Sequence, residues 1–156
     1  MVRVLFVCLG NICRSPMAEA IFRDLVAKEQ LADRIKVDSC GTGDWHLGQP
    51  PHQGTKKILE QQGVSYDGMK ARLLTEDDYK QFDYMVAMDQ NNYEALKRSG
   101  NHKDTQIVKL MDFVEDIEDN EIPDPYYTGD FEQTYQLVSN GCHQFLQFLK
   151  GKHHLI

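Results

Sequence analysis

The sequence has no long hydrophobic run, no excess of basic residues and no internal repeat. No apolar stretch approaches the ~18 residues that a membrane-spanning helix needs. The formal net charge is -7, whereas surfaces that bind nucleic acid are basic, so we expect no binding to DNA or RNA. With 156 residues, 41% of them hydrophobic and 26% charged, the composition is that of one globular domain over residues 1–156.

The chain also lacks the cysteine density of small secreted proteins, in which disulfides make up for a small core. Its four cysteines are Cys8, Cys13, Cys40 and Cys142. Arg3, the apolar residues 4–9 and Ala-Glu-Ala at 18–20 superficially resemble a signal peptide, but that apolar run is only six residues long. We therefore expect a cytoplasmic protein without a membrane segment, in which Cys40 and Cys142 are small buried hydrophobic residues.

A short loop near the N-terminus is suited to binding an anion. It follows the apolar residues 4–7 and reads Cys-Leu-Gly-Asn-Ile-Cys-Arg-Ser at residues 8–15. The backbone N–H groups of such a loop can converge on an anion, and the helix expected after it adds the positive end of its dipole. Arg14 adds a planar guanidinium that binds two phosphate oxygens at once. Cys8 would then lie beneath the phosphorus as a thiolate that this positive field stabilises. The residues expected to surround the phosphate with them are Leu9, Gly10, Asn11, Ile12, Cys13 and Ser15.

Strand and helix patterns alternate along the whole chain. We expect strands over residues 2–7, 35–40, 84–88 and 106–110. We expect helices from Pro16, between Pro51 and a C-terminal cap at Gly63, from a capping box at Thr75 to Phe82, from an N-cap at Asp89 to Ser99, and over residues 131–149. Residues 111–129 are acidic and contain proline, which predicts a surface loop.

This alternation predicts an α/β fold, a single-domain, doubly wound, four-stranded parallel sheet with helices on both faces. Ligands of such sheets bind at the carboxyl ends of the strands. The Cys8 loop follows the first strand, so the motif and the predicted fold indicate an anion site at the same edge of the sheet.

A thiolate that attacks a phosphate ester needs fixed donors for the phosphoryl oxygens, a donor to itself and an acid for the leaving group. The loop amides and Arg14 meet the first need. Ser15 is the nearest donor for the second, although it can equally cap the helix. The histidines do not cluster with the motif, so a carboxylic acid is the candidate for the third. Asp124, between two prolines and before two tyrosines, stands out in the acidic segment 112–124, although it can also be a simple turn residue.

Taken together, these motifs resemble the low-molecular-weight protein tyrosine phosphatases. The resemblance rests on Cys-Leu-Gly-Asn-Ile-Cys-Arg-Ser-Pro at 8–16, Asp-Ser-Cys-Gly-Thr at 38–42, Trp45, and Asp-Pro-Tyr-Tyr at 124–127, in the family's order over essentially the whole chain. It implies a phosphotyrosine phosphatase that acts through a cysteinyl-phosphate intermediate. In that reaction Cys8 is the nucleophile, Arg14 is the phosphate clamp, and Asp124 is the general acid and then the general base.

The resemblance implies roles for several other residues. Asn11 would hold the loop in a strained shape, and Ser39 would support the loop from the second strand. Trp45, Tyr126 and Tyr127 match positions that form the walls of the crevice in which the substrate ring lies. These three aromatic residues would otherwise be interpreted as partly exposed packing residues.

Cys13 has a second role by the same resemblance, because it would pair with Cys8 on oxidation and protect the nucleophile. No metal or other cofactor is implied, since the amides and Arg14 act where a cation would. The implied partners are phosphotyrosine-containing proteins or peptides, and small aryl phosphates are further substrates. We expect mostly a monomer, and the sequence leaves a weak dimer open.

One position departs from the family pattern, and three alternatives remain. Many relatives carry His-x-Ala-Arg where this chain has Met69 and the three residues after it, so the histidine that braces the loop is replaced.

A thiol-linked arsenate reductase needs a further pair of cysteines in mid-chain, and residues 75–95 contain none. Protein arginine phosphatases tend to carry threonine in place of Ile12. A non-catalytic phosphate-binding module would need neither Cys8 nor Asp124.

Overall fold

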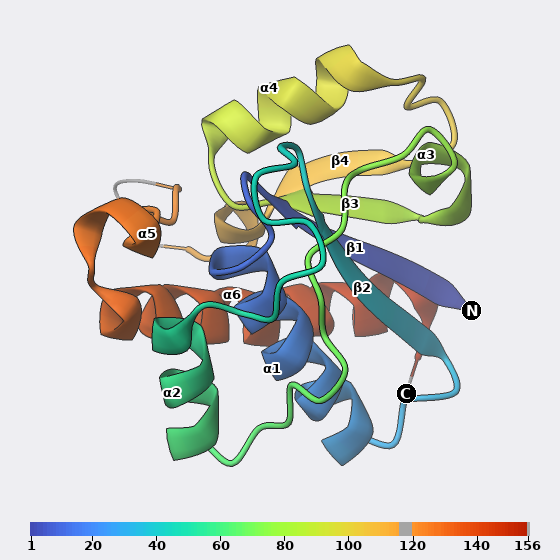
Figure 1. Ribbon diagram of the computed structural model, residues 1–156. Helices are drawn as coiled ribbons and strands as arrows, with labels where there is room; N and C mark the ends of the chain where they lie inside the picture. Colours follow the sequence, from blue (N-terminus) through green and yellow to red (C-terminus); the bar gives the residue numbers. More distant parts are fainter. Residues whose placement is uncertain (116–119, 156) are drawn as a thin grey trace.

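The computed structural model describes residues 1–115 and 120–155, and a parallel sheet of four strands lies at its centre (Figure 1). The strands are β1 (Val2–Cys8), β2 (Ile35–Gly41), β3 (Tyr84–Ala87) and β4 (Gln106–Lys109). Their order is β2-β1-β3-β4, and every pair is parallel. The predicted α/β fold and all four predicted strands are confirmed, with ends that differ by one residue.

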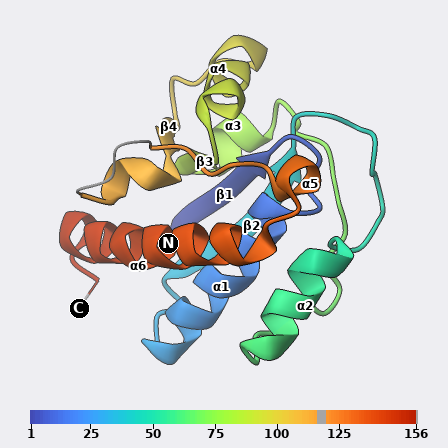
Figure 2. The ribbon, with the colours of Figure 1, turned by 90° about the vertical axis from the view of Figure 1, so that its left-hand side faces the viewer.

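Helices cover both faces of the sheet, as predicted (Figures 1 and 2). On one face α1 (Arg14–Lys28) packs against α6 (Phe131–His153), and α2 (Gln53–Gln61) lies beside both. On the opposite face lie α3 (Asp78–Gln81) and α4 (Gln90–Ser99). In the part of the chain that the structure describes, no helix is both long and apolar enough to cross a membrane.

The central strand β1 contributes to the hydrophobic core on both sides. Val4 and Phe6 belong to the cluster beneath α1 and α6, whereas Leu5 and Val7 belong to the cluster beneath α3 and α4. All four side chains are fully buried. A strand covered on both faces has no polar side, which explains why residues 4–7 are continuously apolar rather than alternating. Arg3, near the start of the strand, is exposed.

The core under α6 contains a row of apolar side chains from this last helix. Val138, Cys142, Phe145 and Leu149 are fully buried there. The ring of Phe145 lies 5.5 Å from that of Phe22 and 6.4 Å from that of Phe6, centre to centre. Cys40 and Cys142 are buried free thiols, as expected, and burial raises the pKa of both.

The prediction of one surface loop over residues 111–129 is wrong. Leu110–Phe113 forms a turn of 3-10 helix, η1, and Pro125–Thr128 forms the one-turn helix α5. Ile122 between them is fully buried, so a large apolar side chain ties this acidic segment to the core. Residues 116–119, part of the same segment, lie outside the described residues.

Two helices were expected to begin with a side-chain cap, and one of these caps is confirmed while the other is only partly formed. The Asp89 carboxylate accepts from the N–H of Asn92, which caps α4 as expected. At α3 the N–H of Thr75 donates to the Asp78 carboxylate, but no side chain caps the helix. The Asp78 carboxylate also accepts from the Arg72 guanidinium, so this residue ties α3 to the segment before it.

Candidate active site

The Cys8 loop lies at the carboxyl end of β1, where the sequence predicted an anion site. Cys8 is the last residue of β1, and α1 begins six residues later at Arg14. Gly41 pairs with Cys8 at the end of β2. A Cβ on Gly41 would lie only 2.9 Å from the Leu9 carbonyl oxygen and 3.2 Å from the Asn11 nitrogen. Only glycine therefore allows the second strand to approach the loop this closely.

The loop backbone has free donors. The N–H groups of residues 9–15 donate to no acceptor within the described ranges 1–115 and 120–155. Asn11 adopts a φ of 57°, a left-handed conformation that is uncommon outside glycine and that turns the chain sharply. Buried N–H groups without partners are costly, so this arrangement suits an anion that would accept from them.

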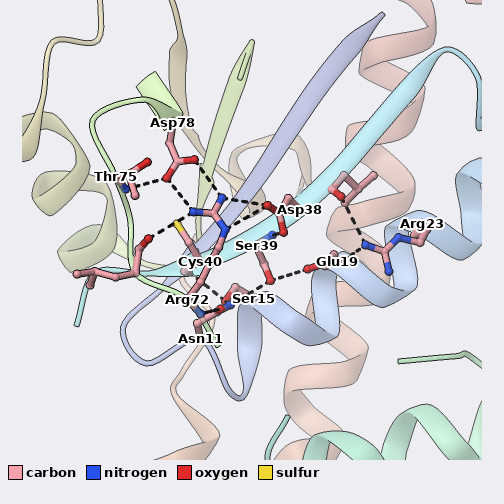
Figure 3. Close-up of polar contacts among 12 residues, drawn as sticks. Asn11, Ser15, Glu19, Arg23, Asp38, Ser39, Cys40, Arg72, Thr75 and Asp78 are labelled. Atoms are coloured by element: carbon pink, nitrogen blue, oxygen red, sulfur yellow. Dashed lines mark hydrogen bonds and ion pairs between the residues drawn. The ribbon is translucent and has the colours of Figure 1, made fainter. Parts of the chain in front are cut away.

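The Asn11 side chain braces the loop from inside. Its Nδ2 donates to Ser15 Oγ at 2.8 Å and to Ser39 Oγ at 3.0 Å, and its Oδ1 accepts from the N–H of Arg72 at 2.9 Å (Figure 3). The hydrogen bond from the Arg72 N–H to Asn11 is made by the backbone, so it does not need the histidine that many relatives carry at the position of Met69. Met69 instead packs against the core, so the missing histidine leaves Asn11 fully bonded.

Ser15 contacts the Cys8 sulfur rather than capping the helix. Its Oγ lies 2.9 Å from Cys8 Sγ. The N-cap position of α1 is Cys13, which makes no side-chain cap. Of the two interpretations that the sequence left open for Ser15, the structure therefore favours the donor to the thiolate.

Arg14 is almost completely buried, with 2% of its surface exposed, and its guanidinium is held from three sides. Nη1 donates to Asp89 Oδ2 at 2.7 Å and to the Ile122 carbonyl at 2.9 Å, and Nη2 donates to Asp124 Oδ2 at 3.3 Å. Nε is buried without a partner in the described part of the chain. Burial alone lowers the pKa of Arg14, but the negative charges of Cys8, Asp89 and Asp124 outweigh burial and raise it, so Arg14 stays charged.

Asp124 lies across the site from the loop and is fixed by its own backbone. One carboxylate oxygen accepts from the N–H of Tyr126 at 3.0 Å and so caps α5, while the other faces Arg14. Pro125 occupies the first position of α5, where a missing N–H does no harm. Asp124 is therefore more than the simple turn residue of the alternative interpretation. It caps α5 and also accepts from the buried Arg14.

A pocket of about 250 Å³ opens above Cys8. Its lining residues are Cys8, Leu9, Gly10, Ile12, Cys13, Trp45, His46, Asp124, Tyr126 and Tyr127. The aromatic rim is strongly exposed, with 66% of Trp45 and 74% of Tyr127 open to solvent. The structure therefore brings the three predicted crevice residues to one pocket with Cys8 and Asp124. Arg14 does not line this pocket and contacts it through Asp124.

His46 lines this pocket and was not predicted from the sequence. Its ring lies 5.7 Å from that of Tyr126, and its Nδ1 lies 3.2 Å from the Gln49 side-chain oxygen. The only sequence signal was its position next to Trp45. The loop has no regular periodicity because it contains several glycines and prolines. Being next to Trp45 in sequence therefore does not predict that the His46 side chain faces the pocket.

Cys13 lies in the same pocket as Cys8, and both are buried free thiols. Burial, followed by the charges of Cys8 and Asp124, raises the pKa of Cys13 to about 12. Cys13 is therefore a neutral thiol at physiological pH and does not compete with Cys8 as a nucleophile.

Comparison with known proteins extends these observations to the whole chain. The family model for low molecular weight phosphotyrosine protein phosphatase matches residues 3–155. The chain is 53% identical over 156 residues to the low molecular weight protein-tyrosine-phosphatase YfkJ of Bacillus subtilis, which covers 99% of this chain and 100% of the relative. It is 47% identical over 149 residues to PtpA of Staphylococcus aureus, covering 96% and 94% of the two chains.

Solved structures agree with the sequence matches. The crystal structure of YfkJ superposes with a TM-score of 0.95 and covers 97% of this chain and 96% of the other. The crystal structure of an arginine phosphatase from Drosophila, 36% identical, superposes with a TM-score of 0.88 and covers 94% and 97%.

Proposed function

Because the chain belongs to the low molecular weight phosphotyrosine protein phosphatase family and is thus a phosphoric monoester hydrolase, we propose that it hydrolyses phosphotyrosine through a cysteinyl-phosphate intermediate. Cys8 is the nucleophile, Arg14 the phosphate clamp and Asp124 the general acid and base. One observation carries the proposal: the Nε of Arg14 and the loop amides are donors without protein acceptors around the Cys8 sulfur, within the residues described. A phosphoryl group would supply the missing acceptors.

In the first step the Cys8 thiolate attacks phosphorus, a P–S bond forms and the P–O bond to the tyrosyl ring breaks. The loop amides and Arg14 donate to the three equatorial oxygens, over which the negative charge of the transition state is spread. Asp124 gives its proton to the leaving phenoxide. The Ser15 hydroxyl, 2.9 Å from the sulfur, stabilises the thiolate before attack.

In the second step a water molecule attacks phosphorus on the face that the phenol has left. Asp124, now ionised, takes a proton from that water, the P–S bond breaks, and inorganic phosphate leaves the regenerated Cys8 thiolate. The same carboxyl group thus acts as acid and then as base. Its cap to the N–H of Tyr126 supports this double role, because the cap holds the carboxyl group in one place through both steps.

The aromatic rim supports phosphotyrosine as the substrate. Trp45, Tyr126 and Tyr127 offer flat apolar surfaces to a phenyl ring whose phosphate lies in the loop. The ring centres of Tyr126 and Tyr127 are 5.4 Å apart at an interplanar angle of 77°, so the two rings contact each other edge to face.

A panel of phosphopeptides tests this function. We expect kcat/KM for a phosphotyrosine peptide to exceed that for the matched phosphoarginine peptide by at least about tenfold, because Ile12 lines the pocket with an apolar side chain. Ile12→Thr should reduce this preference. Equal or faster hydrolysis of phosphoarginine would instead assign the activity that is known for the Drosophila relative.

Oxidation gives a second test, of the proposed pairing between the two pocket thiols. Peroxide converts the Cys8 thiolate to a sulfenic acid, and the Cys13 thiol then displaces water to form a disulfide. We expect a severalfold excess of peroxide to inactivate the enzyme, and dithiothreitol to restore it, because the disulfide blocks oxidation of the sulfenic acid by a second peroxide. In Cys13→Ser the recovered fraction should fall severalfold as Cys8 proceeds to sulfinic acid, which mass spectrometry detects; equal recovery in this variant would contradict the pairing.

A further inference from the structure

Two charged residues that the proposed reaction does not use lie beneath the Cys8 loop. Glu19 is buried on α1, and its Oε1 accepts from Ser39 Oγ at 2.6 Å. Its other oxygen forms an ion pair with Arg23, one turn further along the helix and half exposed. Figure 3 shows Glu19 and Ser39 joined to Asn11 and Ser15 in one row of polar contacts; we call these four side chains the Glu19 relay.

The direction of every bond in the relay follows from one backbone group. The N–H of Arg72 can only donate, so Oδ1 of Asn11 must face it and both protons of Nδ2 must point to the two serines. Ser39 then accepts from Asn11 and donates to Glu19. Ser15 likewise accepts from Asn11, so its own proton goes to the Cys8 sulfur at 2.9 Å rather than to the Cys40 carbonyl at 3.5 Å.

This arrangement suits an ionised Glu19, because both of its oxygens accept, one from Ser39 and the other from Arg23, and neither is left to carry a proton. Burial raises the pKa of Glu19, and the Ser39 hydrogen bond and the Arg23 charge oppose that rise, while Asp38 on β2 adds to it. Lys70 and Met69 line a small cavity beside Glu19. Arg23 is the cation that forms an ion pair with Glu19 among the described residues.

We propose that the Glu19–Arg23 ion pair is a positioning element for the nucleophile. Ionised Glu19 holds Ser39 as its donor, Ser39 and the Arg72 backbone hold Asn11, and Asn11 turns the Ser15 hydroxyl toward the Cys8 thiolate. The proposal rests on the proposed function in that it takes Cys8 as the reacting group. Neither Glu19 nor Arg23 touches the substrate, so both act only through the relay.

The test compares Arg23→Ala and Glu19→Gln with the wild type, using Cys8 alkylation by iodoacetamide as a readout that needs no turnover. We expect both variants to lower the alkylation rate at pH 6.5 and kcat for p-nitrophenyl phosphate by roughly threefold to thirtyfold, with KM changed less than about twofold. The deficit of Arg23→Ala should grow from pH 7.5 to pH 5, because Glu19 without its cation takes up a proton more readily. Arg23→Lys should restore most of the rate.

Two controls separate positioning from general destabilisation. Lys28→Ala removes the Asp24–Lys28 ion pair, which has the same spacing on the same helix but does not touch the relay, and should leave both rates unchanged. In a Ser15→Ala background, Arg23→Ala should have no further effect, because the relay already ends before the sulfur. Wild-type rates in Arg23→Ala, an equal loss in Lys28→Ala, or additive losses with Ser15→Ala would overturn the proposal. A wild type that alkylates quickly but hydrolyses no aryl phosphate would instead refute the proposed function.

Discussion

Replacing Cys8 with serine is expected to lower turnover of phenyl phosphate by at least about 10⁴-fold. A serine hydroxyl stays protonated at neutral pH and is a far weaker nucleophile than a thiolate. The donors for the phosphoryl oxygens, the loop amides and Arg14, are untouched by the change. Inorganic phosphate should therefore still bind, which isothermal titration calorimetry measures directly.

Cys13→Ser provides the matched comparison, because it makes the same chemical change in the same loop and pocket. Acid-quenched Cys13→Ser should carry phosphate on Cys8 during turnover, as the wild type does, whereas Cys8→Ser should carry none on sulfur. Substantial turnover by Cys8→Ser, or a phosphoenzyme trapped on Cys13, would refute the assignment of the nucleophile. Loss of phosphate binding in Cys8→Ser would show instead that the loop had lost its shape.

Replacing Asp124 with asparagine is expected to slow the first turnover of phenyl phosphate by about 10²–10⁴-fold, the range for a lost general acid. Asparagine caps helices as well as aspartate does, so α5 and the two tyrosines should stay in place. The effect on p-nitrophenyl phosphate should be much smaller, because nitrophenolate leaves without a proton. Rapid-quench measurement of phenol release separates this step from the later hydrolysis.

Asp130→Asn is the control for the capping role of Asp124. Asp130 caps α6 by accepting from the N–H of Gln133 at 2.9 Å, but it does not line the pocket. We expect its rates to stay within about twofold of the wild type. An equal loss with both leaving groups in Asp124→Asn would mean that the carboxylate matters for phosphate binding, through Arg14, rather than for proton transfer.

The local parts of this protein were predictable because their causes are local. A parallel strand is apolar where both of its faces are covered, and residues 4–7 of β1 show that pattern in the sequence. Asp89 precedes a helix and caps it, as its residue type predicts. The sequence also predicted where the Cys8 loop lies, between the carboxyl end of β1 and the start of α1, because strand, loop and helix follow one another directly along the chain.

The errors and omissions fall where distant residues meet. The acidic segment was predicted as a loop, yet Ile122 is buried in the core, and its carbonyl, 108 residues from Arg14 in sequence, accepts from the guanidinium. His46 enters the pocket through the path of a loop that no periodicity describes. Such contacts depend on how the helices, strands and loops pack against one another. The pattern of residues in a single sequence does not predict that packing.

The sequence by itself determined that the Cys8 loop is suited to phosphate, because a thiol, an arginine and a glycine-containing turn lie within eight residues. Only the tertiary structure decided how the groups around that loop contact one another. The parallel register of β1 and β2 brings Ser39 beneath the loop, where it meets Glu19 of α1. The approach of α4 and α5 brings Asp89 and Asp124 to one buried arginine. The physical reason is burial, which makes each of these charges depend on its partner and leaves only a few arrangements that satisfy all of them.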